Sequence, residues 1–330
     1  MDMTDVVIIG GGPAGLAVAE TLQSAGLGVV VFEKGAIADC VRRWPYYLRF
    51  FSTAPNLELA GFPLIIRDEK PTREEYLAYL RRFVQDKHLD VRTGHSVTEV
   101  RRNGEDDGFL VRGTNEHAEW FEQPARFVVV ATGAYDYPQM LNVPGEDLPK
   151  VSHYFTEVHP YAFRKVAVIG GKSSAVETAL LLQRAHAEVT LIHRGPRIEG
   201  IKYWLQPDIE NRISAGEIKA LFKANVIAIR PHVLDVRLES GKIAQIENDY
   251  VLAMTGYQPD LTLLSSMGVV FNAGTKRPQF DPSTFETNVP GIYVAGVVIS
   301  GSIGGQVFIE NARDHGAPIL ASIRAKRGNA

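Results

Sequence analysis

The sequence predicts an α/β chain made of two similar three-layer domains, the second inserted in the first. The main observation is an internal repeat: residues 5–35 and 165–195 each contain an apolar run, a tight glycine turn, a helical stretch and a second apolar run. Both copies are followed by short alternating segments that end in similar runs, "VVVATG" and "YVLAMTG". A proline-bearing stretch comes after each of these runs and is typical of a crossover between domains.

Length and composition suit a globular protein with two cores: 330 residues, of which 45% are hydrophobic and 22% are charged. The formal net charge of −3 provides no overall attraction to nucleic acid or to an anionic membrane, so neither is an expected partner. The first apolar run follows Asp2 and Asp5 and is broken by glycine, unlike a signal peptide or a membrane span. We therefore expect a cytoplasmic protein.

The first copy carries a dinucleotide-binding fingerprint of the Rossmann type. Residues 6–9 are β-branched and continuous, as in a strand buried on both faces, and the pattern Gly10-x-Gly12-x-x-Gly15 follows at once. Gly10 permits the turn, Gly12 lets the backbone approach a pyrophosphate, and Gly15 lets the helix pack on the strand. The phosphates then meet the positive end of the helix dipole. Glu33 ends the second apolar run, where a carboxylate accepts both hydroxyls of an unphosphorylated ribose.

The second copy has the same elements but ends in basic residues. Its turn reads Gly170-Gly171-Lys172-Ser173-Ser174-Ala175. Where Glu33 stands in the first copy, the second has His193 and Arg194, with Arg197 close behind. A guanidinium offers a 2′-phosphate a planar fork of donors, whereas a carboxylate would repel it. The first copy is therefore predicted to bind an ADP-ribose with free hydroxyls and the second NADPH; a solvated loop is the alternative reading of the three basic residues.

Lys172 occupies the position at which the first copy has Gly12. A side chain there must point outward, so its ammonium is expected near phosphate oxygens or along the path of the nicotinamide. Ser173 and Ser174 place hydroxyls at the helix start, where they suit both N-capping and phosphate binding. Because Lys172 breaks a glycine pattern without a local gain, we interpret it as functional.

The remaining segments complete both domains. Residues 96–131 and 218–254 each read as a small antiparallel meander that ends in a buried strand, with turns at 103–108 and at Ser240-Gly241. The run "TNVPGIYVAGVV" reads as one more strand, followed by a glycine loop and a helical segment over 307–312. The predicted domains are 1–151 with 258–330 for the first, and 152–257 for the inserted one.

The order of these motifs resembles, over the whole chain, the two-dinucleotide-binding-domain flavoproteins of low-molecular-weight thioredoxin reductase type. Within that group the sequence is similar to the YpdA-type bacillithiol disulfide reductases, through "GGKSSAVETAL", "FFSTAPNLELAGFPL", "WLQPDIENRISAGEI", "AMTGYQPD", "ETNVPGIYVAGV" and "FIENARDHG". The resemblance implies two Rossmann-like domains with FAD in the first and NADPH in the second. It also implies a homodimer.

By this resemblance, residues that match the family's motifs are expected to contact the two cofactors. For FAD they are Gly10, Gly12, Pro13, Ala14 and Gly15 at the pyrophosphate, Glu33 and Lys34 at the adenosine ribose, the Val97 backbone at the adenine, Ser52, Thr132, Gly133 and Gly296 along the cleft, and Phe308 and Ile309 near the flavin end. For NADPH they are Gly170, Gly171, Lys172, Ser173, Ser174, Ala175, His193, Arg194 and Arg197.

Two departures from the family concern thiols. Thioredoxin reductases carry a CxxC motif before the second glycine turn, and "VSHYFTEVHPYAFR" has no cysteine there, which excludes a dithiol relay to thioredoxin. YpdA-type enzymes usually read GGGPCG, and here the cysteine position is Ala14. Attack on a disulfide by a protein side chain needs a thiolate, so the family's substrate does not follow from its cofactors. A smaller departure is Val297, where the wider superfamily has Asp.

Cys40 is the sole cysteine, so no intramolecular disulfide and no CxxC zinc site can form, and we expect no metal centre. It is the one thiol available as a catalytic relay, and Arg42 and Arg43 beside it are expected to lower its pKa. The alternative is a buried small hydrophobe, the commoner role of a free cysteine. No spacing singles out a proton donor among the candidates His153, His159 and His315.

The predicted function is that of an NADPH-dependent FAD oxidoreductase, in which hydride passes from NADPH to flavin and electrons then reach an acceptor. The resemblance implies a low-molecular-weight disulfide such as bacillithiol disulfide. The alternatives are a quinone, a small redox protein such as ferredoxin, or oxygen as acceptor; a flavin monooxygenase; and a non-enzymatic NADPH-responsive redox sensor. A monooxygenase would explain "SHY" at 152–154, but the rest of the signature FxGxxxHxxx[WY] is absent.

Overall fold

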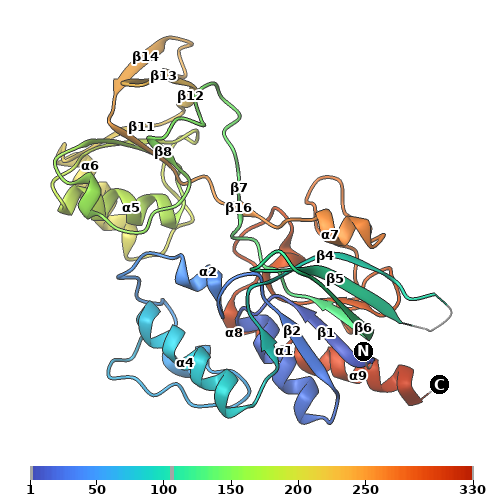
Figure 1. The fold of residues 1–330 in the computed structure, drawn as a ribbon. Helices are drawn as coiled ribbons and strands as arrows, with labels where there is room; N and C mark the ends of the chain where they lie inside the picture. Colours follow the sequence, from blue (N-terminus) through green and yellow to red (C-terminus); the bar gives the residue numbers. More distant parts are fainter. Residues whose placement is uncertain (1–2, 105–107, 329–330) are drawn as a thin grey trace. The chain divides into compact units, whose positions relative to one another are not determined.

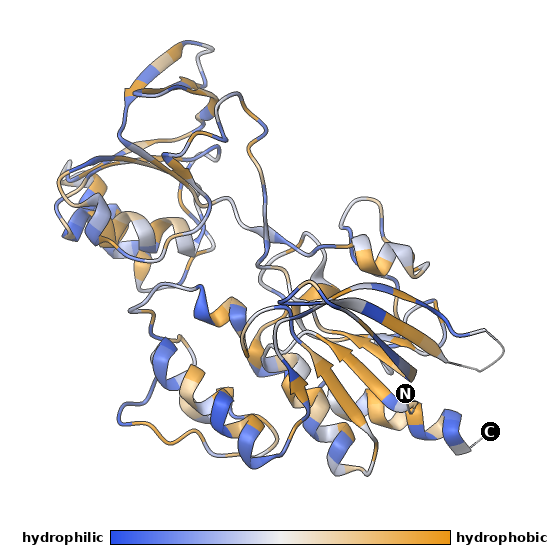
Figure 2. Cartoon of the chain, in the orientation of Figure 1, coloured by the Kyte–Doolittle hydropathy of each residue, from blue (hydrophilic) through white to orange (hydrophobic). Residues whose placement is uncertain are grey.

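The computed structural model describes residues 3–104 and 108–328. The chain divides into two compact units, and the second interrupts the first: Met1–Tyr137 with Tyr257–Ala330, and Pro138–Gly256. Each unit contains a parallel sheet and a small antiparallel one or meander, so the predicted α/β fold with an inserted second domain is confirmed. Apolar residues concentrate in the strands of both units (Figure 2).

The first unit is built on a sheet in the order β3-β2-β1-β6-β5-β4, with β17 also paired to β6. Figure 1 labels β1, β2, β4, β5 and β6 of this sheet. Its strands are β1 Thr4–Ile9, β2 Val29–Phe32, β3 Val91–Arg92, β4 His95–Arg102, β5 Phe109–Asn115, β6 Trp120–Val130 and β17 Ile292–Val294. β6 pairs in parallel with β1 and β17 and antiparallel with β5, so the meander continues the parallel sheet. The predicted turn at 103–108 lies partly outside the described residues.

Helices and loops cover both faces of this sheet and make three layers. One apolar cluster joins the sheet to α1, α4 and α9, and a second joins its other face to α7 and η2. The helices of the unit are α1 Pro13–Ser24, α2 Asp39–Arg42, α3 Ala54–Leu57, α4 Arg73–Asp86, α7 Thr262–Ser266, η2 Gly296–Ser300, α8 Ile309–Ala312 and α9 Gly316–Gly328. α4 begins with a capping box, in which Thr72 and Glu75 satisfy each other's backbone N–H groups.

The second unit has a parallel sheet in the order β11-β10-β9-β15-β8 and a separate antiparallel sheet in the order β12-β13-β14. Its elements are β8 Val151–Ser152, η1 His159–Tyr161, β9 Lys165–Ile169, α5 Ser173–Arg184, β10 Glu188–Ile192, α6 Leu205–Ser214, β11 Ile218–Leu221, β12 Asn225–Ile229, β13 Val233–Arg237, β14 Ile243–Glu247 and β15 Tyr250–Ala253. α5 and α6 pack on one face of the parallel sheet, and the antiparallel sheet packs on the other. The predicted turn at Ser240-Gly241 is present between β13 and β14, with Gly241 at φ +80°.

The first crossing between the units falls after Tyr137, earlier than the sequence suggested, because residues 138–151 pack within the second unit. β8 extends the second unit's parallel sheet beside β15. Leu141, Val143 and Leu148 pack against the same apolar cluster as the antiparallel sheet. At the two crossings, the short strands β7 (Tyr137–Pro138) and β16 (Tyr257–Gln258) pair with each other.

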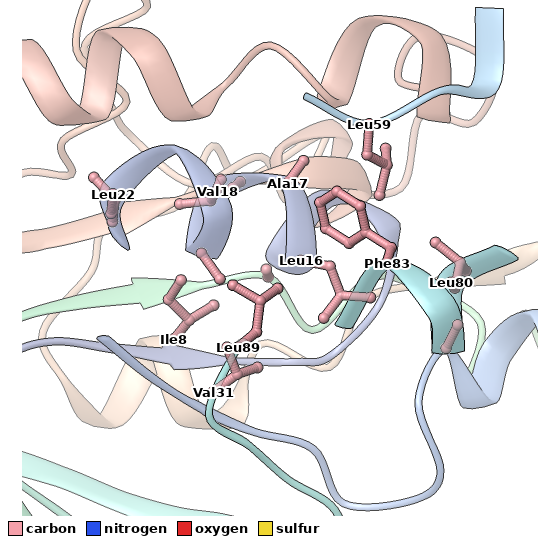
Figure 3. Close-up of a cluster of buried hydrophobic side chains, with 14 of the residues drawn as sticks. Ile8, Leu16, Ala17, Val18, Leu22, Val31, Leu59, Leu80, Phe83 and Leu89 are labelled. Carbon is pink, nitrogen blue, oxygen red and sulfur yellow. The ribbon is translucent and has the colours of Figure 1, made fainter. Parts of the chain in front are cut away.

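Leu16 of α1 tests the packing of the first unit. Its side chain is fully buried in one cluster with Ile8 of β1 and with Leu80 and Phe83 of α4 (Figure 3). Leu16→Ala should destabilise this unit by about 2–5 kcal/mol, since it removes buried methyl groups and leaves a cavity. Ile65→Ala, at a side chain that is 87% exposed, is the control and should change stability by less than about 0.5 kcal/mol. Calorimetric melting measures both; equal melting temperatures would contradict the described core.

Candidate dinucleotide sites

The glycine turn of the first unit combines two crowded glycines with an open one. A Cβ on Gly10, whose φ is +113°, would lie 2.4 Å from the Ala131 carbonyl oxygen, and one on Gly15 would lie 2.0 Å from the Gly10 carbonyl oxygen. A Cβ on Gly12 would meet no described atom within 4 Å. Gly10 and Gly15 are thus required by the packing of β1, β6 and α1. Gly12 leaves the backbone at the start of α1 accessible, as a bound pyrophosphate requires.

Glu33 is buried at the end of β2 and holds the glycine turn in place. Its Oε2 accepts a hydrogen bond from the Gly11 N–H at 2.7 Å, and its Oε1 accepts one from the Gly35 N–H at 2.8 Å. Burial raises the pKa of the Glu33 carboxyl above its ordinary value, while these two N–H groups oppose the rise. Each carboxylate oxygen has a further lone pair with which it can accept a ribose hydroxyl.

Thr132 and Gly133 follow β6 beside this turn, and they provide a test of whether a polar ligand fits. The Thr132 hydroxyl is buried and has no hydrogen-bond partner among the described residues. A Cβ on Gly133, whose φ is +70°, would likewise meet no described atom within 4 Å. A buried hydroxyl without a partner is costly, so a bound polar group next to an open backbone would satisfy it. These residues therefore fit the phosphate and hydroxyl groups of FAD.

Ala14 and Gly296 meet at the start of α1, where the chain leaves β17. A Cβ on Gly296, whose φ is +74°, would lie 2.8 Å from the Ala14 Cβ. The Gly296 N–H donates to Nδ1 of His315 at 3.1 Å, and the His315 ring stacks on Phe285 with centroids 4.2 Å apart. Burial lowers the pKa of His315 to about 4, so its imidazole is neutral at pH 7. A neutral ring whose Nδ1 is occupied as an acceptor is a poor proton donor.

The remaining predicted FAD residues are distributed over several loops of the first unit. Ser52 donates a hydrogen bond to the Glu310 carboxylate, which attaches its loop to α8. Phe308 precedes α8 and is half-exposed, and Ile309 begins it. Val97 lies in β4 next to an irregularity in the pairing with β5. Lys34 forms an ion pair with Asp136 at 2.7 Å, so its ammonium is engaged by a carboxylate that the sequence did not point to.

Cys40 lies in α2, and the structure contradicts the expectation of a lowered pKa. Burial is the largest influence on its thiol and, together with the nearby Glu33, raises the pKa to about 12. Arg42 pairs with Asp39 at 2.7 Å, and Arg43 pairs with Asp39 at 2.9 Å and also with Asp136. Carboxylates thus engage both guanidinium groups. The Cys40 thiol is protonated at neutral pH and packs against the apolar core.

The glycine turn of the second unit is closed on one side by His193. A Cβ on Gly171 would lie 2.2 Å from the His193 ring, and one on Gly170 would lie 2.5 Å from the Met254 carbonyl oxygen. Burial lowers the pKa of His193, and the positive charges of Arg194 and Lys172 lower it further. The ring is therefore neutral and serves as a wall of the turn, while the charged groups lie around it.

Lys172 and Ser173 connect the turn of the second unit to the loop after β10. Lys172 Nζ donates to the Glu199 carbonyl oxygen at 3.3 Å, and Ser173 Oγ accepts from the Lys202 N–H at 3.1 Å. Neither residue caps α5 through its side chain. Ala175 is buried and would be 2.8 Å from a Cβ on Gly170, whereas Ser174, Arg194 and Arg197 are exposed. The predicted NADPH residues are thus brought together at the ends of β9 and β10.

Two further findings concern metal binding and membrane-spanning helices. Among residues 3–104 and 108–328, no group of three or more His, Cys, Asp or Glu side chains is arranged to hold a metal ion. In the same part of the chain, no helix has the length and apolarity needed to cross a membrane.

The fold and the two glycine turns define a class of oxidoreductases that carry two dinucleotide-binding domains in one chain. Residues 7–296 match the family model of pyridine nucleotide-disulphide oxidoreductases. The chain is 40% identical to the bacilliredoxin reductase Bdr of Bacillus subtilis over 324 residues, which are 98% of each protein. The chain belongs to the pyridine nucleotide-disulphide oxidoreductase family and, within it, to the Bdr (YpdA) group.

Two more comparisons show how far the similarity extends. The solved structure of the bacillithiol disulfide reductase Bdr (YpdA) from Bacillus cereus superposes with a TM-score of 0.96, at 40% identity, over 98% of this chain and 100% of that one. A ferredoxin–NADP reductase of Ignicoccus hospitalis is 27% identical over 302 residues, 89% of this chain and 90% of its own. The predicted family, the FAD-containing oxidoreductase class and the FAD and NAD(P)H cofactors are thereby confirmed.

A side chain at Gly15 would clash with the backbone whereas one at Gly12 would not, so alanine at these two positions should have different effects. Gly15→Ala should prevent the close approach of α1 to the Gly10 carbonyl and lower both the melting temperature and the FAD content. Gly12→Ala should fold normally, because its backbone has φ −78° and ψ 176° and its Cβ has space, but should retain less FAD. Melting curves and the flavin-to-protein absorbance ratio measure the two effects. Full FAD content in Gly12→Ala would show that the pyrophosphate does not contact this turn.

His315 gives a prediction about pH. The pKa of this buried histidine falls from 6.5 to about 4 on folding, so between these values the unfolded chain binds a proton that the folded chain excludes. The contribution of His315 to the free energy of unfolding is therefore fully present above pH 6.5 and is lost as the pH falls towards 4. His315→Asn keeps an acceptor for the Gly296 N–H but cannot titrate. The free energy of unfolding of the wild type should therefore fall by up to about 3 kcal/mol relative to that of this variant between pH 6.5 and pH 4. Parallel curves of unfolding free energy against pH would refute the lowered pKa of His315.

Proposed function

We propose that the chain transfers electrons from NADPH through FAD to a low-molecular-weight disulfide of the bacillithiol class. The observation that carries this proposal is the 40% identity over 98% of the chain to a bacilliredoxin reductase, together with the fold of a bacillithiol disulfide reductase. In the overall reaction, NADPH gives up a hydride, which is two electrons and one proton. With one further proton, the two electrons convert one disulfide into two thiols, and NADP⁺ remains.

The charge of the side chains near each glycine turn would decide which cofactor each unit binds. The acidic Glu33 and the open Gly12 favour FAD in the first unit, where Thr132 and Gly133 offer a hydroxyl and free backbone. The basic end of β10 in the second unit favours the 2′-phosphate of NADPH over the plain ribose of NADH. FAD, when bound, supplies a two-electron carrier between the nicotinamide and the acceptor. The chain's own contribution is to bind, orient and shield these groups.

A thiol relay on this chain is not part of the proposal. The family's cysteine position is Ala14, and the sole cysteine, Cys40, is protonated and packs, partly buried, against the core. The absence of a thiolate favours a second candidate, a non-disulfide acceptor such as ferredoxin, which the name of the Ignicoccus relative supports. A homodimer and a cytoplasmic location complete the proposal, and sedimentation equilibrium tests the former.

The acceptor is identified by anaerobic reduction with NADPH followed by reoxidation with bacillithiol disulfide, other disulfides, quinone, ferredoxin and oxygen. We expect NADPH to bleach the oxidised flavin spectrum and bacillithiol disulfide to restore it. Cys40→Ser should leave turnover unchanged, because the protonated thiol takes no part. Ala14→Cys should raise disulfide turnover, since it places a thiol at the position that the family uses.

Each other outcome has a distinct meaning. Loss of disulfide turnover in Cys40→Ser would make Cys40 the relay, despite its raised pKa. Reoxidation by ferredoxin or quinone but not by disulfides would select the second candidate. Flavin reduction without reoxidation by any acceptor would indicate a sensor of NADPH in place of an enzyme.

A further inference from the structure

Glu199 is an acidic residue that contacts two of the basic residues at the second glycine turn. Its Oε2 lies 2.9 Å from Arg197 Nε, and its carbonyl oxygen accepts the hydrogen bond from Lys172 Nζ. One residue therefore joins a lysine of the turn to an arginine of the loop after β10. The Arg197 and Glu199 side chains are 77% and 59% exposed, so a ligand can reach both.

The main chain on both sides of Glu199 is anchored. Ile198 is buried, and its carbonyl accepts a hydrogen bond from Gln206 Nε2 at 3.1 Å. Beyond Glu199, the Lys202 N–H donates to Ser173 Oγ. Because these contacts hold the backbone, the Glu199 carboxylate stays within reach of Arg197 unless its own side chain rotates away.

The charges around His193 show that Glu199 belongs to the same electrostatic environment as the basic residues. Arg194 and Lys172 both lower the pKa of His193, and Glu199 acts in the opposite direction. The end of β10 is thus a positive region in which the Glu199 carboxylate pairs with the Arg197 guanidinium. An anion that pairs with Arg197 through Nε has to displace the Glu199 carboxylate, and one that pairs through the other guanidinium nitrogens binds next to that negative charge.

We propose that Glu199 competes with the 2′-phosphate of the nucleotide for Arg197, and so limits the preference of the second unit for NADPH over NADH. The inference rests on the proposed binding of NADPH by this unit. A phosphate pairs best with a guanidinium that is free, and it is repelled by a carboxylate that remains nearby. NADH has no 2′-phosphate, so its binding does not require the ion pair to open.

The test uses Glu199→Gln with Glu210→Gln as its matched control. Glu210 lies on α6 and lines the same cavity of about 480 Å³ as Glu199, and its carboxylate contacts Gln206 in place of an arginine. Both substitutions remove one negative charge and keep the size of the side chain. Calorimetric titration of the purified FAD-loaded protein measures the dissociation constants of NADP⁺, NAD⁺ and adenosine 2′-monophosphate.

Glu199→Gln should bind NADP⁺ and adenosine 2′-monophosphate about two- to five-fold more tightly, the range expected for an exposed ion pair. Its affinity for NAD⁺ should change much less, and the gain for NADP⁺ should shrink as ionic strength rises. Glu210→Gln should resemble wild type for all three ligands. Weaker NADP⁺ binding in Glu199→Gln would overturn the proposal, because Glu199 would then position Arg197 for the phosphate.

Arg194→Glu and Arg197→Gln separate this inference from the function on which it depends. If they reduce the NADP⁺ preference while Glu199→Gln matches Glu210→Gln, the NADPH site stands and the competition is refuted. If neither arginine variant alters the ratio of NADP⁺ to NAD⁺ affinity, the 2′-phosphate site lies elsewhere and the placement of NADPH fails as well.

Discussion

The close approach of α1 to the end of β1 is the constraint on which the first glycine turn depends. In the first unit, a Cβ at Gly15 would stand 2.0 Å from the Gly10 carbonyl oxygen, so no larger residue allows this packing. The approach directs the N–H groups at the start of α1 towards the space in front of Gly12. Glu33 then secures the turn through the Gly11 N–H. Packing and anion binding therefore arise from the same contact.

The second unit has Ala175 where the first has Gly15, and the chemistry around its turn differs as well. His193 occupies the space that a side chain on Gly171 would need, and Lys172 extends from the turn to the loop at Glu199. Acidic Glu33 secures the first turn, whereas basic residues surround the second. In the proposed function, the difference between the nucleotide preferences of the two units is carried by side chains at the ends of β2 and β10.

The redox chemistry is constrained by what burial does to ionisable groups. Cys40 is surrounded by apolar side chains and acidic groups, and this environment keeps its thiol protonated despite the two neighbouring arginines. His315 is kept neutral by the same effect and serves as an acceptor for the Gly296 backbone, opposite Ala14. Protein groups near the first turn are thus suited to holding a cofactor, and electron transfer is left to the cofactor itself.

The sequence by itself determined the two strand–turn–helix–strand repeats, their glycine turns and the presence of an inserted domain, because continuous β-branched runs and the spacing of Gly10, Gly12 and Gly15 report local structure directly. It also determined the sign of the charge after each second strand. Only the tertiary structure decided how those charges are paired, including Arg197 with Glu199, and that burial outweighs the arginines next to Cys40. Pairing and desolvation depend on groups that the fold brings together from distant parts of the chain, and no spacing along the sequence encodes them.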